Sequence, residues 1–396
     1  MQRFSAEEQL SPAVAVTRGL KFHWFGYYDK CPWSADGRYM LAMEVDFMDR
    51  PPTGSDSIRV GMVDLQAGDR EFIPLDETHA WCWQQGTMLQ WLATDPNRLV
   101  IYNSVQDGEY CSIIRDVHSG ETRVLPRPVY AVSPDGTQAV SLNFSRVART
   151  RPGYGYYALP DPTEGVMHPD DDGVWWIDLQ TGETKLILTI DQITQVAYRR
   201  SMENENWFNH MQFCTDGRRF LFLHRWKRAD GVRHFTQLFT ANPDGSDLYL
   251  VADDDMISHF DWLDERHIIA WATHRHIGNR YFLYRDQTPW LQVVGDDVFT
   301  SDGHMSYSPG DRRYLLTDTY PDAQMKRSLI IYDTQTGRRA DIGRFLSPRR
   351  YSGEIRCDLH PRWNRDGTQV CFDSIHEGQR QMYVIDVAQY LEDRVP

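Results

Sequence analysis

The sequence predicts an all-β protein built as a seven-bladed β-propeller. The main observation is a repeat in which an apolar, aromatic-led strand is broken by a short turn and then resumes. Its seven copies begin at residues 32, 90, 131, 212, 261, 306 and 362. A second series of strands follows in step, from RVGMVDLQAGD to MYVIDVAQY. One four-stranded sheet cannot bury both faces, whereas seven arranged radially can, because each packs against two neighbours.

The turn of each copy justifies its two strands in chain order. The copies over 32–43, 90–102, 131–142 and 212–223 turn at SADG, TDPN, SPDG and TDG. The copies over 261–271, 306–317 and 362–373 turn at DER, SPGD and RDG. Gly, Pro, Asn and Asp favour tight reversals of the chain, so each copy is predicted to be a hairpin.

The ring of hairpins accounts for residues 21–390, so we expect a single domain over residues 1–396. The last blade is one strand short, because the chain ends soon after MYVIDVAQY. The segment 13–22 has strand character and no blade of its own, so we expect it to close the ring as the outer strand of that blade. A long insertion over 143–173, rich in Gly, Pro and Asp, is more typical of a functional loop than of a structural one.

Composition excludes several classes of function. Lys+Arg 42 against Asp+Glu 56 gives a net charge of −14, which repels nucleic acid and anionic membranes. No apolar run reaches the roughly eighteen residues of a membrane span. The N-terminal segment has acidic residues at positions 7 and 8 and no continuous apolar region, which predicts a cytoplasmic protein without a secretory signal. Six Cys without CxxC pairing indicate free thiols in a reducing compartment.

Four consecutive copies carry a His at one position of the innermost strand. Three residues before the leading apolar or aromatic residue lie His210, His259, His304 and His360. With 14 His in 396 residues, chance would place fewer than one in the seven equivalent positions. A single His in a propeller usually makes a structural hydrogen bond, but four in register favour a shared site. Because every innermost strand starts at the same end of the channel, we expect these imidazoles to ring one mouth.

Loops that return to this mouth add Arg and Tyr side chains. Arg225 follows the hairpin of the fourth copy, and Tyr154 and Tyr156 lie in the long insertion. The residues that we assign to substrate binding are Arg151, Asn209, Trp226, Arg275 and Tyr28. A His ring joined by Arg and Tyr suits an anion pocket. The alternative is a solvated rim of charges, because Arg pairs are common on any surface.

His304, Asp358 and His360 form a candidate metal site. Asp358 and His360 are two residues apart in an extended segment, so both can point to one side. Two imidazoles and a carboxylate suit a divalent ion, with Mn²⁺ or Zn²⁺ first and Ca²⁺ as a further option. Asp358 can instead orient an imidazole without touching an ion.

The chain resembles the propeller-fold polysaccharide lyases over nearly its whole length, namely oligogalacturonate lyase, the propeller ulvan lyases and the rhamnose–glucuronate lyases. The stretches that carry the resemblance are FGYYDKCPWSADGRY (25–39), RPGYGYY (151–157), NHMQF (209–213), SHFDW (258–262), DGHMSYSP (302–309) and DLHPRW (358–363). The turn motif alone is not specific, since TolB-type and peptidase propellers share it. The chain departs from oligogalacturonate lyase at the metal, where that enzyme uses a Gln and three His, two of them as HxH, and this chain has Asp358-Leu359-His360.

The resemblance implies β-elimination at a uronic acid of an acidic oligosaccharide or polysaccharide. An Arg or a metal neutralises the C6 carboxylate, a base removes the C5 proton, and an acid protonates the leaving oxygen on C4. By this resemblance His210 fits the base and Arg225 the carboxylate clamp. Tyr154 or Tyr156 fits the acid, and His259 fits a second substrate contact or acid.

Other functions stay open from the sequence. A non-catalytic TolB-like propeller would bind a glycan or a protein, although such a module has no need of four imidazoles around one channel. A glycoside hydrolase would need paired carboxylates, and no Asp/Glu pair stands out beside the four His. A serine peptidase is disfavoured, because the sequence has no GxSxG motif and no additional catalytic domain.

Overall fold

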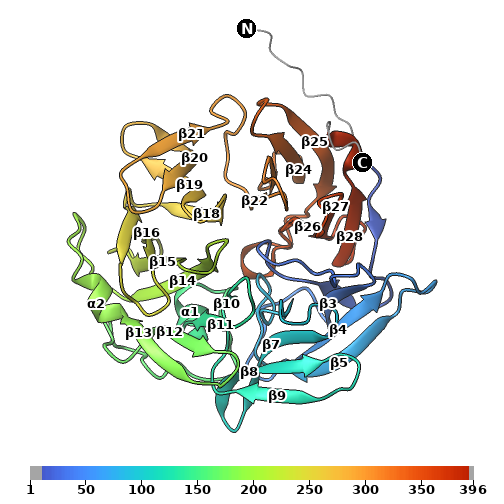
Figure 1. Cartoon of the computed structure of the whole chain (residues 1–396), viewed down its shortest axis with the longest axis horizontal. Coiled ribbons are helices and arrows are strands. Elements are labelled where there is room, and N and C mark those ends of the chain that lie inside the picture. The colour runs from blue at the N-terminus through green and yellow to red at the C-terminus, as the bar shows by residue number, and fades with distance from the viewer. Residues whose placement is uncertain (1–10, 392–396) are drawn as a thin grey trace.

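The seven-bladed β-propeller is confirmed by the computed structural model, which describes residues 11–391. Seven antiparallel four-stranded sheets stand around a central channel, and the colours of Figure 1 run around the ring in chain order. The described residues contain four short helices: α1 (Phe144–Thr150), α2 (Ile190–Thr194) and the 3-10 turns Gly353–Ile355 and Ala388–Tyr390. No helix within residues 11–391 is long and apolar enough to cross a membrane.

The strands of each blade follow one another outward from the channel. The first blade contains β2 (Phe22–Trp24), β3 (Tyr39–Val45), β4 (Ile58–Asp64) and β5 (Phe72–Thr78). The second contains β6 (Gln90–Trp91), β7 (Leu99–Gln106), β8 (Glu109–Asp116) and β9 (Thr122–Leu125). The third contains β10 (Ala131–Val132), β11 (Gln138–Ser141), β12 (Gly173–Asp178) and β13 (Thr184–Thr189). The next two are β14 (Asn206–Phe213), β15 (Phe220–Lys227), β16 (His234–Ala241) and β17 (Tyr249–Ala252); and β18 (Ile257–Trp262), β19 (His267–His274), β20 (Gly278–Arg285) and β21 (Leu291–Val294). The last two are β22 (Ser306–Tyr307), β23 (Tyr314–Asp318), β24 (Lys326–Asp333) and β25 (Arg339–Leu346); and β26 (Arg362–Trp363), β27 (Gln369–Ser374), β28 (Gln381–Asp386) and β1 (Val14–Ala15).

The N-terminal strand lies at the outer edge of the seventh blade. β1 pairs antiparallel with β28, Val14 opposite Val384 and Ala15 opposite Tyr383. The strand is much shorter than the predicted segment 13–22. Phe22 already belongs to β2, the innermost strand of the first blade.

The aromatic residue that leads three of the repeats ties neighbouring blades together. Its indole Nε1 donates to the backbone carbonyl just before the equivalent residue of the preceding blade. The three bonds join Trp91 to Pro32 O (2.9 Å), Trp262 to Gln212 O (3.3 Å) and Trp363 to Ser306 O (3.3 Å). Buried indoles need such a partner, so this position both fills the core between blades and fixes their spacing.

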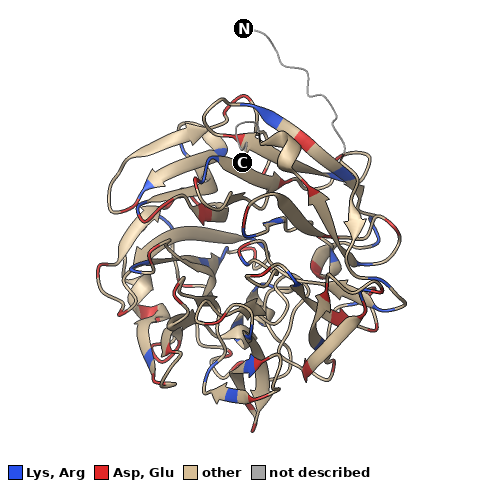
Figure 2. Ribbon diagram, turned by 45° about the vertical axis from the view of Figure 1, so that its right-hand side comes forward, with Lys and Arg blue, Asp and Glu red and all other residues tan. Residues whose placement is uncertain are grey.

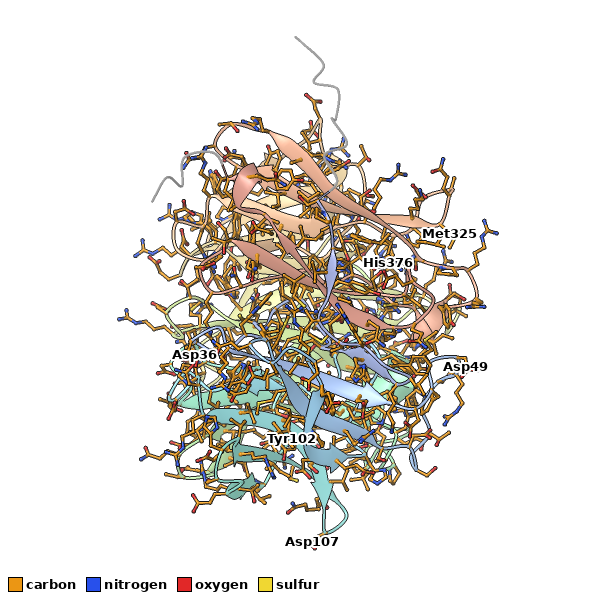
Figure 3. All side chains as sticks on the ribbon, turned by 90° about the vertical axis from the view of Figure 1, so that its right-hand side faces the viewer. Asp36, Asp49, Tyr102, Asp107, Met325 and His376 are labelled. Carbon is orange, nitrogen blue, oxygen red and sulfur yellow. The ribbon has the colours of Figure 1, made fainter. Side chains whose placement is uncertain are left out.

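The two ends of the channel differ. In the side view of Figure 3, Asp36 lies in a repeat turn on one face, which we call the turn face. Asp49 and Met325, in loops between second and third strands, lie on the opposite face, which we call the loop face. Acidic and basic residues are interspersed over the loops in Figure 2, without a continuous basic face.

A segment of the first blade crosses the channel. Trp24 pairs with Met43, and Trp33 forms a β-bridge with Met40. Eight residues (25–32) therefore lie between Trp24 and Trp33, whereas only two (41–42) lie between Met40 and Met43 on the opposite strand. The excess residues leave the blade, and we call residues 25–31 the channel segment. Their path cannot follow from the repeat pattern, because they belong to no strand.

A buried ion pair from the seventh blade holds the channel segment. Arg362 Nη2 lies 2.6 Å from Asp373 Oδ2, and Arg362 also donates to the carbonyls of Gly26 (2.6 Å) and Tyr27 (2.9 Å). The Asp373 carboxylate accepts from the backbone N–H of Phe25 at 3.2 Å. Gly26 is required here, because its φ is +117° and a Cβ would lie 2.9 Å from the backbone of the second blade.

Candidate active site

The structure brings the four aligned histidines together at the loop-face end of the channel. Ring centroids are 4.1 Å apart for His259 and His304, 4.3 Å for His304 and His360, and 6.4 Å for His210 and His259. All four side chains are buried. Imidazoles this close, in a protein interior, have a common environment and can act on one bound molecule.

Irregular backbone aims two of these side chains. His210 and His360 have positive φ, 47° and 42°. In β14 the pairing with β15 runs from Asn209 to Met211 and skips His210, which is the geometry of a β-bulge. The Asn209 side chain accepts from the backbone N–H of His210 at 2.9 Å and so supports the bulge. Such conformations cost energy and are concentrated at functional sites. Asn209, expected to bind substrate, supports His210 through its side-chain oxygen, and its buried Nδ2 atom has no hydrogen-bond partner.

Tyr27 of the channel segment stands at the centre of the ring. Its phenol ring is parallel to the His210 imidazole, with centroids 5.1 Å apart and planes at 2°. It also lies 5.0 Å from His360 and 5.9 Å from His304. Its neighbour Tyr28, expected to bind substrate, donates its hydroxyl proton to the carbonyl of Phe260 at 2.8 Å. The only sequence signal for Tyr27 was a Gly followed by two Tyr in a stretch without strand pattern.

Two of the histidines are oriented by carboxylates. His259 Nδ1 lies 3.0 Å from Asp302 Oδ1, and His304 Nδ1 lies 2.9 and 3.0 Å from the two oxygens of Asp318. A carboxylate accepts the Nδ1 proton, so the Nε2 atom of each ring carries a lone pair. Burial lowers the pKa of His259 below its ordinary value and so favours the neutral imidazole. The charge of Asp302 acts in the opposite direction but is the smaller effect.

The ring nitrogens of His210 are engaged differently. Nε2 lies 3.3 Å from Tyr27 Oη, and Nδ1 lies 3.1 Å from Tyr130 Oη and 3.2 Å from Gln85 Nε2. Burial, and next the positive charge of Arg225, hold the pKa of His210 well below its ordinary value. His210 is therefore a neutral imidazole with both nitrogens in contact with protein groups.

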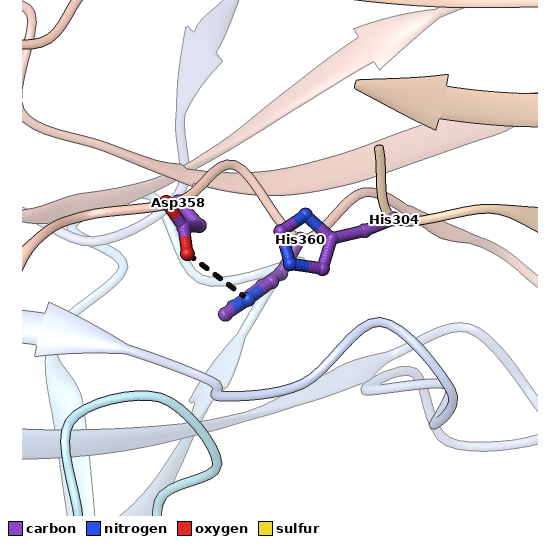
Figure 4. A group of neighbouring side chains, drawn as sticks. All are labelled: His304, Asp358 and His360. Carbon is purple, nitrogen blue, oxygen red and sulfur yellow. Dashed lines mark ion pairs between the residues drawn. The ribbon is translucent and has the colours of Figure 1, made fainter. Parts of the chain in front are cut away.

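His304, Asp358 and His360 form the one group of potential metal ligands found among residues 11–391. One ligand atom from each lies within 4.8 Å of the others, and Figure 4 shows the three side chains, with the ion pair of Asp358 and His360 at 3.8 Å. The buried Nε2 atoms of His304 and His360 make no hydrogen bond to the protein. Two unpartnered imidazole nitrogens beside a carboxylate fit a divalent transition metal.

The carboxylate of this group is also shared with two arginines. Arg327 Nη2 lies 2.6 Å from Asp358 Oδ1, and Arg356 Nε lies 2.7 Å from Oδ2. Burial alone would raise the pKa of Asp358, but these two guanidinium groups hold it well below its ordinary value. Asp358 is thus a permanently ionised group, with lone pairs remaining on each oxygen for a further contact.

Arg225 is a buried guanidinium without a counter-ion. It lies in β15 and is 3% exposed, and its Nε and Nη1 atoms have no hydrogen-bond partner. Among residues 11–391 no carboxylate pairs with it. Burial, and next the charge of Arg151, lower the pKa of Arg225 to about 10, which leaves it charged at neutral pH. The buried Nε of Arg151 also has no partner, so two guanidinium groups next to His210 are free to receive an anion.

Of the two tyrosines expected to act as acid, the structure places one in the site. Tyr154 Oη accepts from Arg356 Nη2 at 2.6 Å, and its ring meets His210 edge-on at 5.3 Å. Tyr156 is fully buried elsewhere. It stacks on Phe144 with centroids 4.2 Å apart, and its hydroxyl accepts from the side chain of Asn103 at 2.9 Å. The structure thus places Tyr156 in the core, where its ring and its hydroxyl both contact core residues, and its expected role as the acid finds no support there.

Two residues expected to bind substrate lie away from the ring. Trp226 follows Arg225 in β15, and strand alternation turns it to the other face, where it stacks on His224 at 5.1 Å and donates to the carbonyl of Ser201 at 2.9 Å. Arg275 lies in the turn after β19, half exposed, and pairs with Asp254 at 2.8 Å. These two assignments are therefore corrected: Trp226 is a core residue and Arg275 a surface ion pair.

Solved structures show the same fold at low sequence identity. Oligogalacturonate lyase from Vibrio parahaemolyticus is 14% identical, with a TM-score of 0.68 over 98% of this chain and 97% of that chain. A structure of oligogalacturonate lyase in complex with manganese is 15% identical, with a TM-score of 0.68 over 97% and 95% of the two chains. The β-propeller domain of the Trilobed protease from Pyrococcus furiosus is 10% identical, with a TM-score of 0.53 over 93% and 96%.

These likenesses establish the fold, which lyases and protease domains share. Comparison with family models and with curated proteins gave no match. The candidate functions therefore depend on the chemistry of the site: four converging imidazoles, a central tyrosine, an unpaired buried arginine and a possible metal position, all at one end of a seven-bladed β-propeller.

Proposed function

We propose that the protein is a carbon–oxygen lyase that cleaves a glycosidic bond at a uronic acid by β-elimination. The observation that carries the proposal is Arg225, a buried guanidinium with two unpartnered nitrogens next to neutral imidazoles. A buried charge without a counter-ion is costly unless a ligand supplies one. Oligogalacturonate lyase, which shares the fold over nearly the whole chain, supports the choice of an acidic saccharide as that ligand.

Arg225 would bind the C6 carboxylate of the uronate. The planar guanidinium donates two parallel hydrogen bonds to a carboxylate, and Arg151 adds a second positive charge beside it. Neutralising the carboxylate stabilises the negative charge that develops when the C5 proton leaves. This is the interaction that makes the C5 proton removable at neutral pH.

His259 is the base that the geometry favours. Asp302 holds its Nδ1 proton, so Nε2 has a lone pair for the C5 proton, and the same carboxylate stabilises the imidazolium that forms. His210, which the resemblance suggested as base, has partners at both ring nitrogens. We therefore assign His210 to support Tyr27 and keep it as the second candidate for the base.

Tyr154 would serve as the acid. Its oxygen already accepts from Arg356, so its own proton is available for the leaving group. In the elimination, His259 takes the proton from C5, the electron pair forms the C4–C5 double bond, and the C4–O bond breaks. The released oxygen takes and keeps the proton of Tyr154. His259 then loses the C5 proton to solvent, and Tyr154 takes up a proton from solvent, which restores both groups.

His304, Asp358 and His360 would hold a divalent ion, Mn²⁺ or Zn²⁺. When bound, the ion would supply additional positive charge for the carboxylate of the substrate. The structure of a fold relative in complex with manganese and the two unpartnered imidazole nitrogens support this assignment.

A panel of uronate-containing oligosaccharides tests the proposal. The lyase reaction leaves a C4–C5 double bond conjugated with the carboxylate, so ultraviolet absorbance should grow with at least one member of the panel. New reducing ends without absorbance would indicate a hydrolase. Saturable binding without cleavage of any member would indicate a propeller that only binds glycans, and the lyase proposal would then be wrong.

A further inference from the structure

A cavity lies at the turn-face end of the channel, opposite the histidines. It has a volume of about 1080 Å³, and a smaller cavity of about 360 Å³ adjoins it. Both are lined by Lys30, Gln212, Arg312 and Arg365, so they form one space, which we call the vestibule. None of the four histidines lines it. Its volume is at or above the range typical of ligand sites, about 300–1,000 Å³.

Two arginines reach the vestibule from neighbouring blades. Arg312 donates to the carbonyls of Leu263 and Trp262, both at 2.8 Å, and Arg365 donates to the carbonyl of Trp33 at 3.1 Å. Within residues 11–391 neither has a carboxylate partner. Backbone carbonyls fix the two guanidinium groups in place without neutralising them, which leaves donors and positive charge for a bound molecule.

The acidic residues of the vestibule wall are occupied with protein groups. Asp29 pairs with Lys30 at 2.8 Å, and Asp264 pairs with His267 at 2.9 Å. Asp311 accepts from the backbone N–H of Arg313 at 3.1 Å. Four carboxylates, with Asp261 as the fourth, and four cationic side chains line the vestibule, so it has no net positive charge. An anion would therefore depend on direct contacts with Arg312 and Arg365, which have no ion pair within residues 11–391.

The smaller cavity of the vestibule, of about 360 Å³, is lined by two residues with buried polar atoms that have no hydrogen-bond partner. The Gln212 Oε1 and Ser306 Oγ atoms make no hydrogen bond. Beside them Asp261 accepts from Gln212 Nε2 and from the backbone N–H of Tyr307, both at 2.8 Å. Buried polar atoms normally have partners, so unpartnered ones in a cavity wall indicate where a ligand donates. Hydroxyl groups suit both atoms, since one accepts only and the other can donate or accept.

We propose that the vestibule is a second, non-catalytic site for an acidic saccharide. Its carboxylate would bind Arg312 and Arg365, and its hydroxyl groups would bind Gln212 and Ser306. The choice of a uronate rests on the proposed function, whereas the anionic and hydroxylated character of the ligand rests on the vestibule alone.

Calorimetric titration with trigalacturonate tests the vestibule in an Arg225→Met background, which disables the proposed catalytic clamp. We expect one saturable site there, and at least a tenfold rise in Kd after Arg312→Gln with Arg365→Gln. The matched control is Arg218→Gln, because Arg218 is an exposed arginine of the same face that does not line the cavity. The corresponding double change to Lys should recover part of the affinity, and thermal melting checks that each variant folds.

Three outcomes would overturn the proposal. If the Kd for trigalacturonate is the same in the double variant, the ligand binds elsewhere. Equal binding of neutral maltotriose removes the anionic recognition. Binding of an acidic peptide such as penta-glutamate, with no binding of trigalacturonate, makes the vestibule a protein-binding surface. The lyase proposal is tested separately. With Arg225 intact, the Arg312→Gln, Arg365→Gln double variant should catalyse elimination at the wild-type rate. Conversely, trigalacturonate can still bind the vestibule in a protein that shows no elimination.

Discussion

The ring of Tyr27 lies parallel to that of His210, with the tyrosine hydroxyl 3.3 Å from Nε2 of the imidazole. Burial, reinforced by neighbouring tyrosines such as Tyr28, raises the pKa of Tyr27 well above its ordinary value, so this hydroxyl stays protonated. The pair joins the channel segment of the first blade to the innermost strand of the fourth. It explains why His210 is less suited than His259 to accept a proton from a substrate.

Alanine substitutions should distinguish the roles of His259, the proposed base, and His210. His259→Ala should lower kcat by about 10²–10⁴-fold, the usual contribution of a positioned base. His210→Ala should act mainly through the position of Tyr27 and lower kcat less. Absorbance kinetics on an active uronate substrate measure both, with His267→Gln, a partly exposed histidine of the turn face, as control. A larger loss for His210→Ala would return the role of base to that residue.

Removing the charge of Arg225 should lower the activity and raise the stability of the protein. Arg225→Met takes away a buried, unpartnered guanidinium and should raise the free energy of unfolding by about 1–3 kcal/mol, the scale of an unsatisfied buried polar group. The same change should abolish elimination. Arg225→Lys keeps the charge but loses the planar fork, so its kcat/KM should fall more than tenfold. Denaturant unfolding and initial rates give both quantities, and a destabilised Met variant would contradict the idea of an unpaired charge.

Chelator-free protein should carry close to one Mn²⁺ or Zn²⁺ per chain at His304, Asp358 and His360. Elemental analysis gives the stoichiometry without an activity assay. His304→Ala should empty the site, because its Nε2 is one of the two unpartnered imidazole atoms, whereas Trp290→Ala, an exposed change far from the ring, should leave it filled. A stoichiometry near zero in the wild type would leave these residues as hydrogen-bonding groups.

Stability should fall on mild acidification because of His224. Burial lowers the pKa of His224 to about 4, with His168 adding a smaller effect in the same direction. Between pH 6.5 and 4 the unfolded chain binds a proton that the folded chain does not, so stability decreases as pH falls through this window. The full effect is about 3 kcal/mol. Urea unfolding at pH 7, 5.5 and 4.5 measures it, and His224→Gln should flatten the profile.

Deleting residues 1–20 removes β1 and should lower the melting temperature. β1 covers the edge of β28 with two backbone pairs, and Val16 N–H adds a bond to the carbonyl of Met382 at 2.8 Å. Without them the seventh blade keeps three strands and an open edge. Thermal unfolding of the truncated protein tests this, and an unchanged melting curve would show that the pairing contributes little.

Much of the fold could be predicted from the sequence, because every blade repeats a turn and a leading apolar or aromatic residue whose physical roles are local. The convergence of the histidines also followed, since strands that start at one end of a channel must bring equivalent residues together. Tyr27 could not be found this way, because its position depends on the distant pair of Arg362 and Asp373. The error at Trp226 was avoidable, because neighbouring residues of a strand face opposite sides.

The channel segment lies between the two ends of the channel: Tyr27 contacts the histidines, and Asp29 and Lys30 line the vestibule. Arg362 and Asp373 anchor its backbone, and Tyr27 occupies the axis where a polymer would have to pass. For the proposed lyase, a long saccharide would then not pass along the channel between cuts. Its substrate would arrive, and both fragments would depart, by the loop face, so that each cut would end in release before the next begins.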